Sequence, residues 1–368
     1  MVASRVSDAE SSITIASHRG PYTAQFTSDA EGMLVDDLAA GAYFLVDARV
    51  AELYPQICSP IIQSGRALLV TATERNKNLD RIPEFAEELL GKGIRRDSTL
   101  VVVGGGITQD ISCFLASVLM RGIPWKFYPT TLLAQADSCI GSKSSINVGK
   151  VKNSAGTFWP PLSVVIDRTF LQTLSDDELR SGIGEIIKVH VIDGPGTFDA
   201  LAADYDKLFG DPVTLERSVR RSLEIKRRII EADEFDTGPR QVLNYGHTFG
   251  HAIESATNYA IPHGIAITIG MDMANYVAVA LGELPAKDRA RMKVITDRNS
   301  RGFKNAETRF DVFASAIKGD KKVSASGITV ILPNRESIPV RLRLPLDDRF
   351  FGLCRDYLME ERGRDVVS

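Results

Sequence analysis

Residues 240–263 read RQVLNYGHTFGHAIESATNYAIPH. The stretch holds three of the chain's five histidines, His247, His251 and His263. The first two are spaced as i and i+4, and residues three or four apart lie above one another on a helix. Pro262 stops that helix, so His263 must return to the pair from a loop or from the start of a new helix. The spacing therefore predicts a histidine-bearing helix and a third histidine beside it.

We expect this helix to run from Leu243 to about Ser255, which also brings Asn244 onto the histidine face. Imidazole nitrogens, with a carboxylate from elsewhere in the chain, would bind a divalent metal in an open site of three protein ligands. The competing interpretation is two ordinary helix histidines and an unrelated third, because His-x-x-x-His recurs by chance. Spacing alone leaves both interpretations open.

The composition excludes several classes of protein. A chain of 368 residues is long enough for two domains, and its net charge of -3 carries no basic footprint for nucleic acid. The four cysteines are far apart and form no C-x-x-C pair, so neither a disulfide framework nor a thiolate zinc site is expected and a cytoplasmic setting fits best. No apolar leader or run of about 18 apolar residues occurs, so we expect neither export nor membrane spanning.

The first half alternates apolar strands with amphipathic helices, which is typical of an α/β domain. One strand ends in Asp47, which can hold the hydroxyls of a ribose or simply cap the next helix. Another strand runs into Gly104, Gly105 and Gly106, followed by a helix. These glycines let a pyrophosphate approach the backbone and the helix amides, although a tight structural turn explains them equally well.

Polar residues dominate the segment 129–161, which is long for a plain connection. It carries Asp137, Lys143, Lys152 and Asn153 among glycines and serines, a set that suits a phosphorylated, hydroxyl-rich small molecule. An ordinary solvated loop is the alternative. After this segment the pattern becomes mostly helical.

The helical half contains one charged pair with unusual surroundings. Ser175 is the expected N-cap of a helix that carries Glu185 and Lys188 three residues apart. Such a pair is usually a surface ion pair. The flanking isoleucines and glycines instead predict that this pair is buried.

Six motifs occur in the order and near-spacing found in the 3-dehydroquinate synthases and their relatives, the sugar phosphate cyclases: GGGITQD, LMRGIPWKFYPTTLLAQADSCIGSK, KNSAGTF, GIGEIIK, EADEFDTGPRQVLNYGHTFGHAIE and PHG. The resemblance runs from about Asp47 to Lys322. It implies a Rossmann-like α/β NAD-binding domain over residues 1–165 and a mostly α-helical metal- and substrate-binding domain over residues 166–368.

The resemblance also assigns residues. Dinucleotide contacts are expected from Asp47, Glu74, Lys77, Gly105, Gly106, Asp110, Thr130, Thr131 and Lys152. Glu185, His247 and His263 match the ligands of Zn²⁺ or Co²⁺. Substrate contacts are expected from Asp137, Lys143, Asn153, Lys188, Lys226, Arg240, Asn244, His251 and one of Lys321 and Lys322. Arg121 matches an arginine that reaches the phosphate from a neighbouring subunit, which implies a homodimer.

The activity that the resemblance implies is a phosphate-eliminating cyclisation of a phosphorylated seven-carbon sugar. NAD would be consumed and regenerated within each turnover, and zinc would act as a Lewis acid. The expected substrate is 3-deoxy-arabino-heptulosonate 7-phosphate and the product 3-dehydroquinate. Asn244 and His251 are retained, which favours this pocket over the epi-valiolone-forming and deoxy-inosose-forming branches.

Five departures from the usual pattern indicate a divergent branch, and all of them except Arg49 motivate an alternative substrate. They are Gln109 and Ser142 in place of glycines, Arg49 in place of asparagine, Asp236 in place of glutamate and Ile265 in place of glutamate. A divergent sedoheptulose 7-phosphate cyclase is therefore the second hypothesis. An NAD- and metal-dependent polyol dehydrogenase is the third, and the lysines at 143, 152, 188 and 226 argue against it because its substrate has no phosphate. A binding module without catalysis would not need all these groups together.

Overall fold

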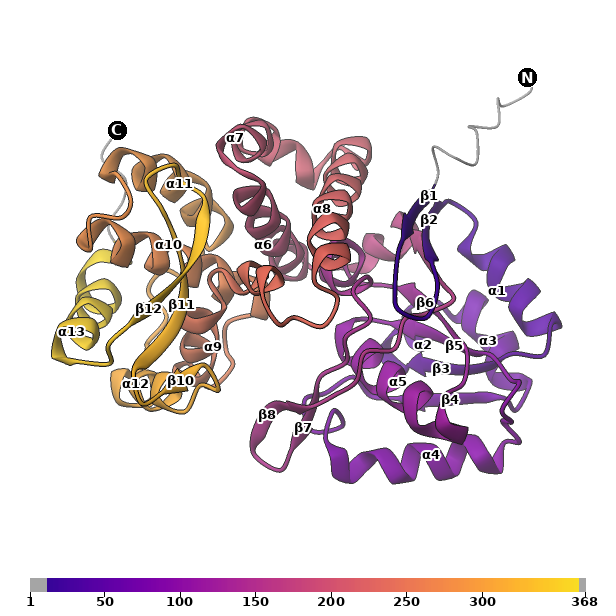
Figure 1. Cartoon of the computed structure of the whole chain (residues 1–368). Helices are drawn as coiled ribbons and strands as arrows, with labels where there is room; N and C mark the ends of the chain where they lie inside the picture. The colour runs from indigo at the N-terminus through magenta and orange to yellow at the C-terminus, as the bar shows by residue number, and fades with distance from the viewer. Residues whose placement is uncertain (1–11, 364–368) are drawn as a thin grey trace, which may run out of the picture. The chain divides into compact units, whose positions relative to one another are not determined.

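The computed structural model describes residues 12–363, which fall into two compact units (Figure 1). The first unit contains the chain up to Leu174 together with Lys226–Phe235. The second contains Ser175–Ile225 and the chain from Asp236 onward. The chain thus leaves the second unit for one short segment, and this segment contains Lys226, one of the predicted substrate residues.

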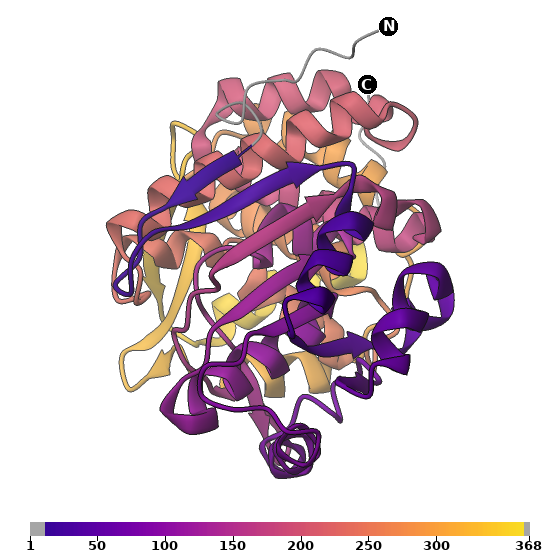
Figure 2. The ribbon, with the colours of Figure 1, turned by 90° about the vertical axis from the view of Figure 1, so that its right-hand side faces the viewer.

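A seven-stranded sheet forms the centre of the first unit, in the order β1-β2-β9-β6-β5-β3-β4. Its strands are β1 (Ser12–Ile15), β2 (Tyr22–Thr27), β3 (Tyr43–Asp47), β4 (Ala67–Val70), β5 (Leu100–Gly104), β6 (Trp125–Pro129) and β9 (Ser163–Asp167). Only β1 runs antiparallel to its neighbour; all other pairs are parallel. Figure 2 shows these strands side by side, with the β1–β2 hairpin at one edge.

Helices pack on this sheet because its central strands are apolar on both faces. Phe44 and Val46 of β3 belong to a buried cluster with residues of α1 and α3. Leu45, which lies between them in the strand, is fully buried as well. The helices of the unit are α1 (Ala30–Ala39), α2 (Ala48–Leu53), α3 (Pro55–Gln63), α4 (Ile82–Gly91) and α5 (Gly106–Val118). The helix α5 packs against β3, β5 and β6, and its N-terminus follows directly on the carboxyl end of β5.

The strand order reverses between β3 and β5. From β3 the chain moves outward to β4, then returns to β5 on the other side and continues through β6 to β9. Asp47 is the last residue of β3, and Gly104 is the last residue of β5. In open parallel sheets, ligands bind at the carboxyl ends of the strands at such a switch point. Topology therefore brings the two predicted nucleotide elements to one edge.

The polar segment 129–161 is structured rather than a plain loop. It contains a π-helix, η3 (Ala134–Ser138), and a two-stranded hairpin, β7 (Ile146–Val148) and β8 (Val151–Ala155). The hairpin bonds back to the first half of the unit, because the Asn147 backbone amide donates to the Lys77 carbonyl. The predicted substrate residues of this segment are therefore held by regular structure.

The second unit is built around one apolar helix. Its helices are α6 (Asp176–Asp193), α7 (Pro195–Asp204), the first part of α8 (Pro212–Ala232), α9 (His247–Ala256), α10 (His263–Ala280), α11 (Ala286–Asn299), α12 (Phe310–Lys318) and α13 (Asp348–Asp356). The central helix, α10, packs against α6, α9, α11, α13 and β11. An antiparallel sheet of β10 (Val323–Ser324), β11 (Gly327–Pro333) and β12 (Pro339–Leu344), which the sequence analysis did not predict, completes the unit.

Short single-turn elements connect the larger ones. They are η1 (Leu79–Arg81), η2 (Leu119–Arg121), η4 (Arg168–Thr173), η5 (Tyr205–Phe209), η6 (Pro239–Asn244) and η7 (Tyr357–Glu361). No helix within residues 12–363 is both long enough and apolar enough to cross a membrane. All four cysteines are buried and free, as expected from their spacing.

The predicted start of the histidine helix was wrong. A 3-10 helix, η6, ends at Asn244, and α9 begins only at His247. Gly246 separates them with a left-handed φ of 77°, and a Cβ there would lie 2.8 Å from the Ile267 carbonyl oxygen. Asn244 therefore does not share a helix with the histidines. Of the two predicted routes for the return of His263, a loop or a new helix start, the structure shows the second, because α10 begins at that residue after Pro262.

Close backbone contact sets the spacing of the helices that carry the cluster. A Cβ on Gly184 of α6 would overlap the carbonyl oxygen of Gly264 on α10, and a Cβ on Gly264 would overlap the carbonyl of Ser181. Only glycine permits backbones to approach this closely. The residue after Gly184 is Glu185 and the residue before Gly264 is His263, so this approach brings the carboxylate and the imidazole together.

His190 near the C-terminal end of α6 predicts a pH-dependent stability. Burial lowers its pKa from 6.5 to about 4, and its Nδ1 lies 2.7 Å from the Ile186 carbonyl oxygen, which accepts the bond. Between pH 6.5 and about 4, His190 is protonated in the unfolded chain but neutral in the native state. The free energy of unfolding therefore falls as the pH drops through this window, by about 3 kcal/mol.

Chemical denaturation at several pH values measures this slope. His190→Gln, which cannot be protonated, is expected to show a flatter loss of stability below pH 6.5 than the wild type. Equal slopes in the two proteins would contradict a neutral buried His190.

Candidate active site

Four predicted residues of the second unit converge on one point. His247, His251 and His263 each offer a ring nitrogen, and these atoms lie within 4.8 Å of one another. Glu185 Oε1 lies 3.4 Å from His263 Nε2 and 3.8 Å from His247 Nε2. Ligand atoms about 2.1 Å from one tetrahedral ion lie about 3.4 Å apart, so these separations suit a shared metal ion.

The two predicted histidine ligands present the same nitrogen to this point. His247 Nδ1 lies 3.2 Å from the Tyr245 carbonyl oxygen, which can only accept, so Nδ1 is the donor. His263 Nδ1 lies 3.3 Å from the Glu254 carboxylate and is fixed in the same way. In the neutral form of each ring, Nε2 then carries the lone pair, and such carbonyl or carboxylate partners orient metal-binding imidazoles in proteins.

The carboxylates beside His263 favour a positive charge between Glu185 and His263. Burial lowers the pKa of His263, but hydrogen bonds to Glu185 and Glu254 and the attraction of both carboxylates outweigh burial and raise it to about 10. Burial and the Lys188 charge hold the pKa of His247 well below its usual value. A metal ion would supply the positive charge that a proton otherwise provides, and its binding would release that proton.

The predicted burial of the Glu185–Lys188 pair is confirmed, since both residues are 2% exposed. The Lys188 ammonium lies 2.5 Å from Glu185 Oε2 without the geometry of a hydrogen bond, so the contact is an ion pair. Glu185 thus turns Oε2 toward Lys188 and Oε1 toward the histidines.

Lys322, rather than Lys321, lies beside the cluster. Its ammonium donates to Thr248 Oγ1 on α9 at 2.9 Å, and its charge contributes to the lowered pKa values of His247 and His251. Lys321 is exposed. Burial in turn lowers the pKa of Lys322.

In the first unit, the nucleotide elements meet at the N-terminus of α5. Gly105 caps this helix without a side-chain hydrogen bond, so the first amides of α5 are not covered by a capping side chain. A Cβ on Gly105 would lie 3.0 Å from Thr131 Cγ2, and Thr130 is buried at the end of β6. Asp47 caps α2 by accepting from the Arg49 amide at 3.0 Å, so capping is its observed contact.

A second group of first-unit residues surrounds the Lys77 ammonium. Lys77 is 6% exposed and contacts Asp110 at 3.1 Å and Asn153 at 3.0 Å. Glu74 lies 3.7 Å from both Lys77 and Lys152. The predicted dinucleotide residues and the predicted substrate residue Asn153 therefore form one polar cluster within this unit.

The other predicted substrate residues occupy different surroundings. Lys226 is buried and contacts the Asp137 carboxylate at 2.5 Å. Lys143 is exposed. Arg121 is exposed as well, in a turn where it and Met120 both have positive φ, at 65° and 52°. In the second unit, Arg240 is only 6% exposed within η6, and the Asn244 amide donates to the Gln241 carbonyl at 3.1 Å.

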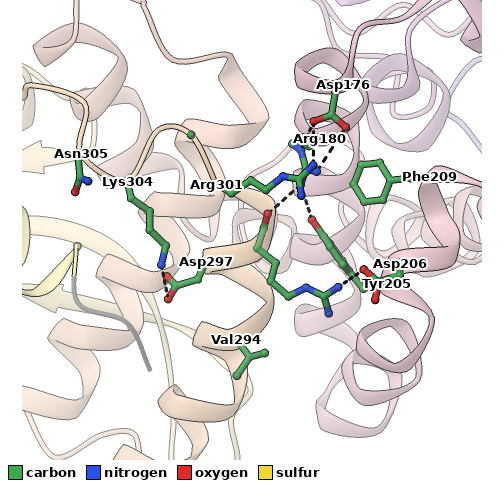
Figure 3. A pocket seen from close by; sticks show the side chains of 12 residues that line it. Asp176, Arg180, Tyr205, Asp206, Phe209, Val294, Asp297, Arg301, Lys304 and Asn305 are labelled. Atoms are coloured by element: carbon green, nitrogen blue, oxygen red, sulfur yellow. Dashed lines mark hydrogen bonds and ion pairs between the residues drawn. The ribbon is translucent and has the colours of Figure 1, made fainter. Parts of the chain in front are cut away.

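A pocket of about 930 Å³ in the second unit contains none of the predicted site residues (Figure 3). Its cationic side chains face carboxylates: Arg180 contacts Asp176 at 2.6 Å, and Lys304 contacts Asp297 at 3.2 Å. Arg180 lies between Asp176 and Tyr205 in Figure 3 and donates to the Tyr205 hydroxyl. Three carboxylates, from Asp176, Asp206 and Asp297, therefore balance most of the positive charge that lines the pocket.

The sequence analysis missed Glu254, which orients His263. The signal was available, because Glu254 follows His251 by three residues and His247 by seven and therefore lies on the same face of α9. The role of the Tyr245 carbonyl could not be read from sequence, since it depends on the turn at Gly246.

Comparison with known proteins identifies the family of the chain. The 3-dehydroquinate synthase N-terminal model matches residues 67–181, and the 3-dehydroquinate synthase C-terminal model matches residues 182–323. The chain belongs to the 3-dehydroquinate synthase family. The resemblance noted in the sequence is thereby confirmed, and the protein is an enzyme of this family of cyclases.

Curated 3-dehydroquinate synthases match most of the chain. That of Streptococcus pyogenes serotype M5 (strain Manfredo) is 35% identical over 325 residues, which cover 86% of this chain and 89% of the relative. That of Dictyoglomus thermophilum is 38% identical over 296 residues, which cover 79% and 82%.

Solved structures confirm the fold class of a parallel α/β unit followed by a mostly helical unit. A 2-deoxy-scyllo-inosose synthase complexed with carbaglucose-6-phosphate, NAD⁺ and Co²⁺ has a TM-score of 0.80 at 20% identity, covering 95% of this chain and 99% of that one. The 2-epi-5-epi-valiolone synthase from Streptomyces hygroscopicus subsp. jinggangensis 5008, with NAD⁺ and Zn²⁺ bound, has a TM-score of 0.77 at 22% identity, covering 91% and 97%. An iron-containing alcohol dehydrogenase has a TM-score of 0.59 at 14% identity, covering 92% and 98%.

Proposed function

We propose that this protein is an NAD- and divalent-metal-dependent cyclase that converts 3-deoxy-arabino-heptulosonate 7-phosphate to 3-dehydroquinate with elimination of phosphate. The main support is the convergence of Glu185, His247 and His263 on one point, with both Nε2 atoms oriented toward it. This donor set suits Zn²⁺ or Co²⁺, and it leaves room for a substrate oxygen as a further ligand.

The same proposal assigns NAD to the first unit. The switch point between β3 and β5, the N-terminus of α5 and the glycines before it support a dinucleotide there. When bound, NAD takes and returns a hydride, and the divalent ion lowers the pKa of the alcohol that it holds. The chain's own residues bind the substrate, orient it and balance its charge.

Two cationic side chains are assigned to the carboxylate of the substrate. Arg240 is buried, and its guanidinium can form two parallel hydrogen bonds with a carboxylate. Lys226 is also buried, with the Asp137 carboxylate beside it. A substrate with a carboxylate can accept charge-assisted hydrogen bonds from these cations, whereas a substrate without a carboxylate cannot.

The phosphate is assigned to Lys143, Asn153, Asn244, His251 and Lys322. Lys322 replaces Lys321 in our assignment because Lys322 lies against Thr248 of α9. Burial and the neighbouring His247 keep the pKa of His251 well below its usual value, so a neutral imidazole faces the substrate. Such an imidazole orients a phosphate oxygen by donating one hydrogen bond.

We propose that the enzyme is a homodimer in which Arg121 reaches the phosphate bound by the partner subunit. The strained turn at Met120 and Arg121 supports this assignment, because positive φ is costly for such residues and recurs at functional sites. Arg121 is also exposed and therefore accessible to another chain.

A sedoheptulose 7-phosphate cyclase is the second candidate. Gln109 and Ser142 depart from the usual glycines. Gln109 donates to the Ser138 carbonyl in the segment that carries Asp137 and Lys143, and Ser142, which lies in that segment, donates to the Glu234 carboxylate. These departures therefore act on predicted substrate residues rather than on the distant surface. A changed sugar specificity would follow if they alter the position of the loop.

One experiment separates the candidates. The purified enzyme is offered both heptulose phosphates with NAD and Zn²⁺ or Co²⁺, and phosphate release, ring product and NADH absorbance are followed together. We expect phosphate release and 3-dehydroquinate from the deoxy acid, with no net NADH. Turnover of sedoheptulose 7-phosphate alone would favour the second candidate. Stoichiometric NADH without phosphate release would indicate a dehydrogenase.

A further inference from the structure

The segment Lys226–Phe235 packs with the first unit, although the chain on both sides of it belongs to the second. At its beginning, the Lys226 ammonium contacts the Asp137 carboxylate at 2.5 Å. Near its end, Glu234 Oε1 accepts a hydrogen bond from the Ser142 hydroxyl at 3.1 Å. This one segment therefore holds both ends of the stretch from Asp137 to Ser142, which directly precedes Lys143.

Glu234 is the centre of a hydrogen-bond network. Its Oε1 also accepts from the Ser17 hydroxyl at 2.5 Å, and its Oε2 accepts from the His18 backbone amide at 2.8 Å. Burial raises the pKa of Glu234, but the hydrogen bonds from Ser17 and His18 outweigh burial and lower it. An ionised carboxylate is a stronger acceptor than a neutral group, so the bond to Ser142 is charge-assisted.

Other contacts fix the same stretch from the sheet side. The Gln109 amide of α5 donates to the Ser138 carbonyl at 2.6 Å, and the Ser138 hydroxyl donates back to Gln109 Oε1 at 2.6 Å. The Gly141 amide donates to the Tyr22 hydroxyl at 2.9 Å. Ser142 and Asp137, the residues at the two ends of this stretch, are tied to the Lys226–Phe235 segment by side-chain contacts.

The position of Lys143 is tied to the same segment by a second contact. Lys143 forms an isolated antiparallel bridge with Phe158, and the Phe158 ring packs edge-on against Phe235 at 5.3 Å. Glu234 therefore constrains Lys143 through Ser142, its neighbour in sequence. Phe235 constrains it through Phe158, its partner across the bridge.

Ser142 adopts a conformation that its side chain disfavours. Its φ is 62°, in the left-handed region, where the family usually has glycine. A glycine would remove this strain but would also remove the hydroxyl that bonds Glu234. Serine at this position therefore has a conformational free-energy cost that glycine would avoid.

We propose that Ser142 and Glu234 are positioning residues that hold Lys143 in place for a phosphorylated substrate. The clamp between the Lys226–Phe235 segment and the stretch from Asp137 to Ser142 stands on the contacts alone. The assignment of phosphate to Lys143 rests on the proposed function.

Two substitutions test the proposal. Ser142→Gly removes both the strain and the hydroxyl, whereas Ser142→Ala removes only the hydroxyl. Both are expected to raise KM for the heptulose phosphate about tenfold, the factor that a lost hydrogen bond to a charged group produces, with kcat within about twofold of wild type. A role in stability alone predicts instead that Ser142→Gly raises Tm and leaves KM unchanged.

Ser337→Gly provides a matched control. Ser337 is also buried and has a φ of 61°, but it lies in the second unit between β11 and β12. It is expected to match Ser142→Gly in Tm and the wild type in KM. A KM change shared by Ser337→Gly, or found in Ser142→Gly but not in Ser142→Ala, would overturn the proposal by assigning the effect to backbone freedom.

Hydrogen exchange gives a readout that does not depend on activity. The amides of Gly141 and Trp159, which bond Tyr22 and the Ser142 carbonyl, are expected to exchange about tenfold faster in both Ser142 variants. If the wild type turns over neither heptulose phosphate, the proposed function fails while this measurement still decides the clamp. Unchanged exchange in both variants would overturn the clamp itself.

Discussion

Glu185→Gln is expected to lose the bound metal ion and to lower kcat by about a thousandfold or more. Glu185 supplies the only carboxylate oxygen that lies within 4 Å of both His247 Nε2 and His263 Nε2 in the described chain. An amide is a much weaker ligand than a carboxylate, and a bound cation supplies several kcal/mol of transition-state stabilisation. Metal analysis of the purified variant, together with phosphate release at saturating substrate, measures both effects.

Glutamine is preferred to alanine for this test because Glu185 also faces the buried Lys188 ammonium. Glutamine also removes the carboxylate, but its amide oxygen can still accept a hydrogen bond from Lys188, whereas alanine would leave a cavity beside the buried ammonium and destabilise the fold for a separate reason. His247→Ala is expected to give the same loss of metal, since a site of three ligands holds its ion poorly with two. Normal metal content and turnover in both variants would contradict the assignment of Glu185 and His247 as metal ligands.

A graded control lies next to the site. Glu254 contacts His263 Nδ1 at 3.3 Å and does not reach the metal point by any described contact. Outer residues of this kind change metal affinity by about 10- to 100-fold. Glu254→Gln should therefore bind metal more weakly but regain activity with added Zn²⁺ or Co²⁺, whereas Glu185→Gln should not. Equal rescue of both variants would contradict the assignment of Glu185 as a ligand.

Sequence reasoning identified the members of the cluster but not all of its geometry. The spacing of His247 and His251 and the break at Pro262 were sufficient to predict a histidine helix and the return of His263 from a loop or a new helix, of which the second is observed. The position of Glu185 depends on the close approach of α6 and α10, where Gly184 and Gly264 face each other. Periodicity describes one helix at a time, so it cannot predict which two helices will touch.

The start of α9 shows a second limit. Leu243 and Asn244 continue the apolar spacing of the helix, but Gly246 takes a left-handed conformation and places both residues in a separate turn. The glycine is visible in the sequence. Its conformation is set by the carbonyl of Ile267 and by Met271 on α10, which are tertiary neighbours. The same reason applies to Lys226, because its membership of the first unit depends on its contacts with Asp137 and not on its place along α8.

Arg240→Ala is expected to lower kcat/KM for 3-deoxy-arabino-heptulosonate 7-phosphate by about 100- to 1000-fold, or ~3–4 kcal/mol. Arg240 is 6% exposed, so its guanidinium meets a ligand in a site largely shielded from water. Breaking a buried charge pair leaves the substrate carboxylate desolvated without its partner. Arg240→Lys keeps the charge but loses the planar pair of donors, and it should fall between alanine and wild type.

The selectivity of this loss is the decisive measurement. A heptulose phosphate without a carboxylate gains nothing from Arg240, so any slow turnover of sedoheptulose 7-phosphate should change by less than about tenfold in Arg240→Ala. Metal content and Tm are measured in parallel, because Arg240 lies in η6 directly before the histidine helix and a misfolded turn would displace His247. If Arg240→Ala retains metal and Tm but keeps kcat/KM for the deoxy acid within about threefold of wild type, Arg240 does not bind the carboxylate. An equal loss of kcat/KM with both sugars would indicate that Arg240 binds a group that the two substrates share, the phosphate or the ring hydroxyls.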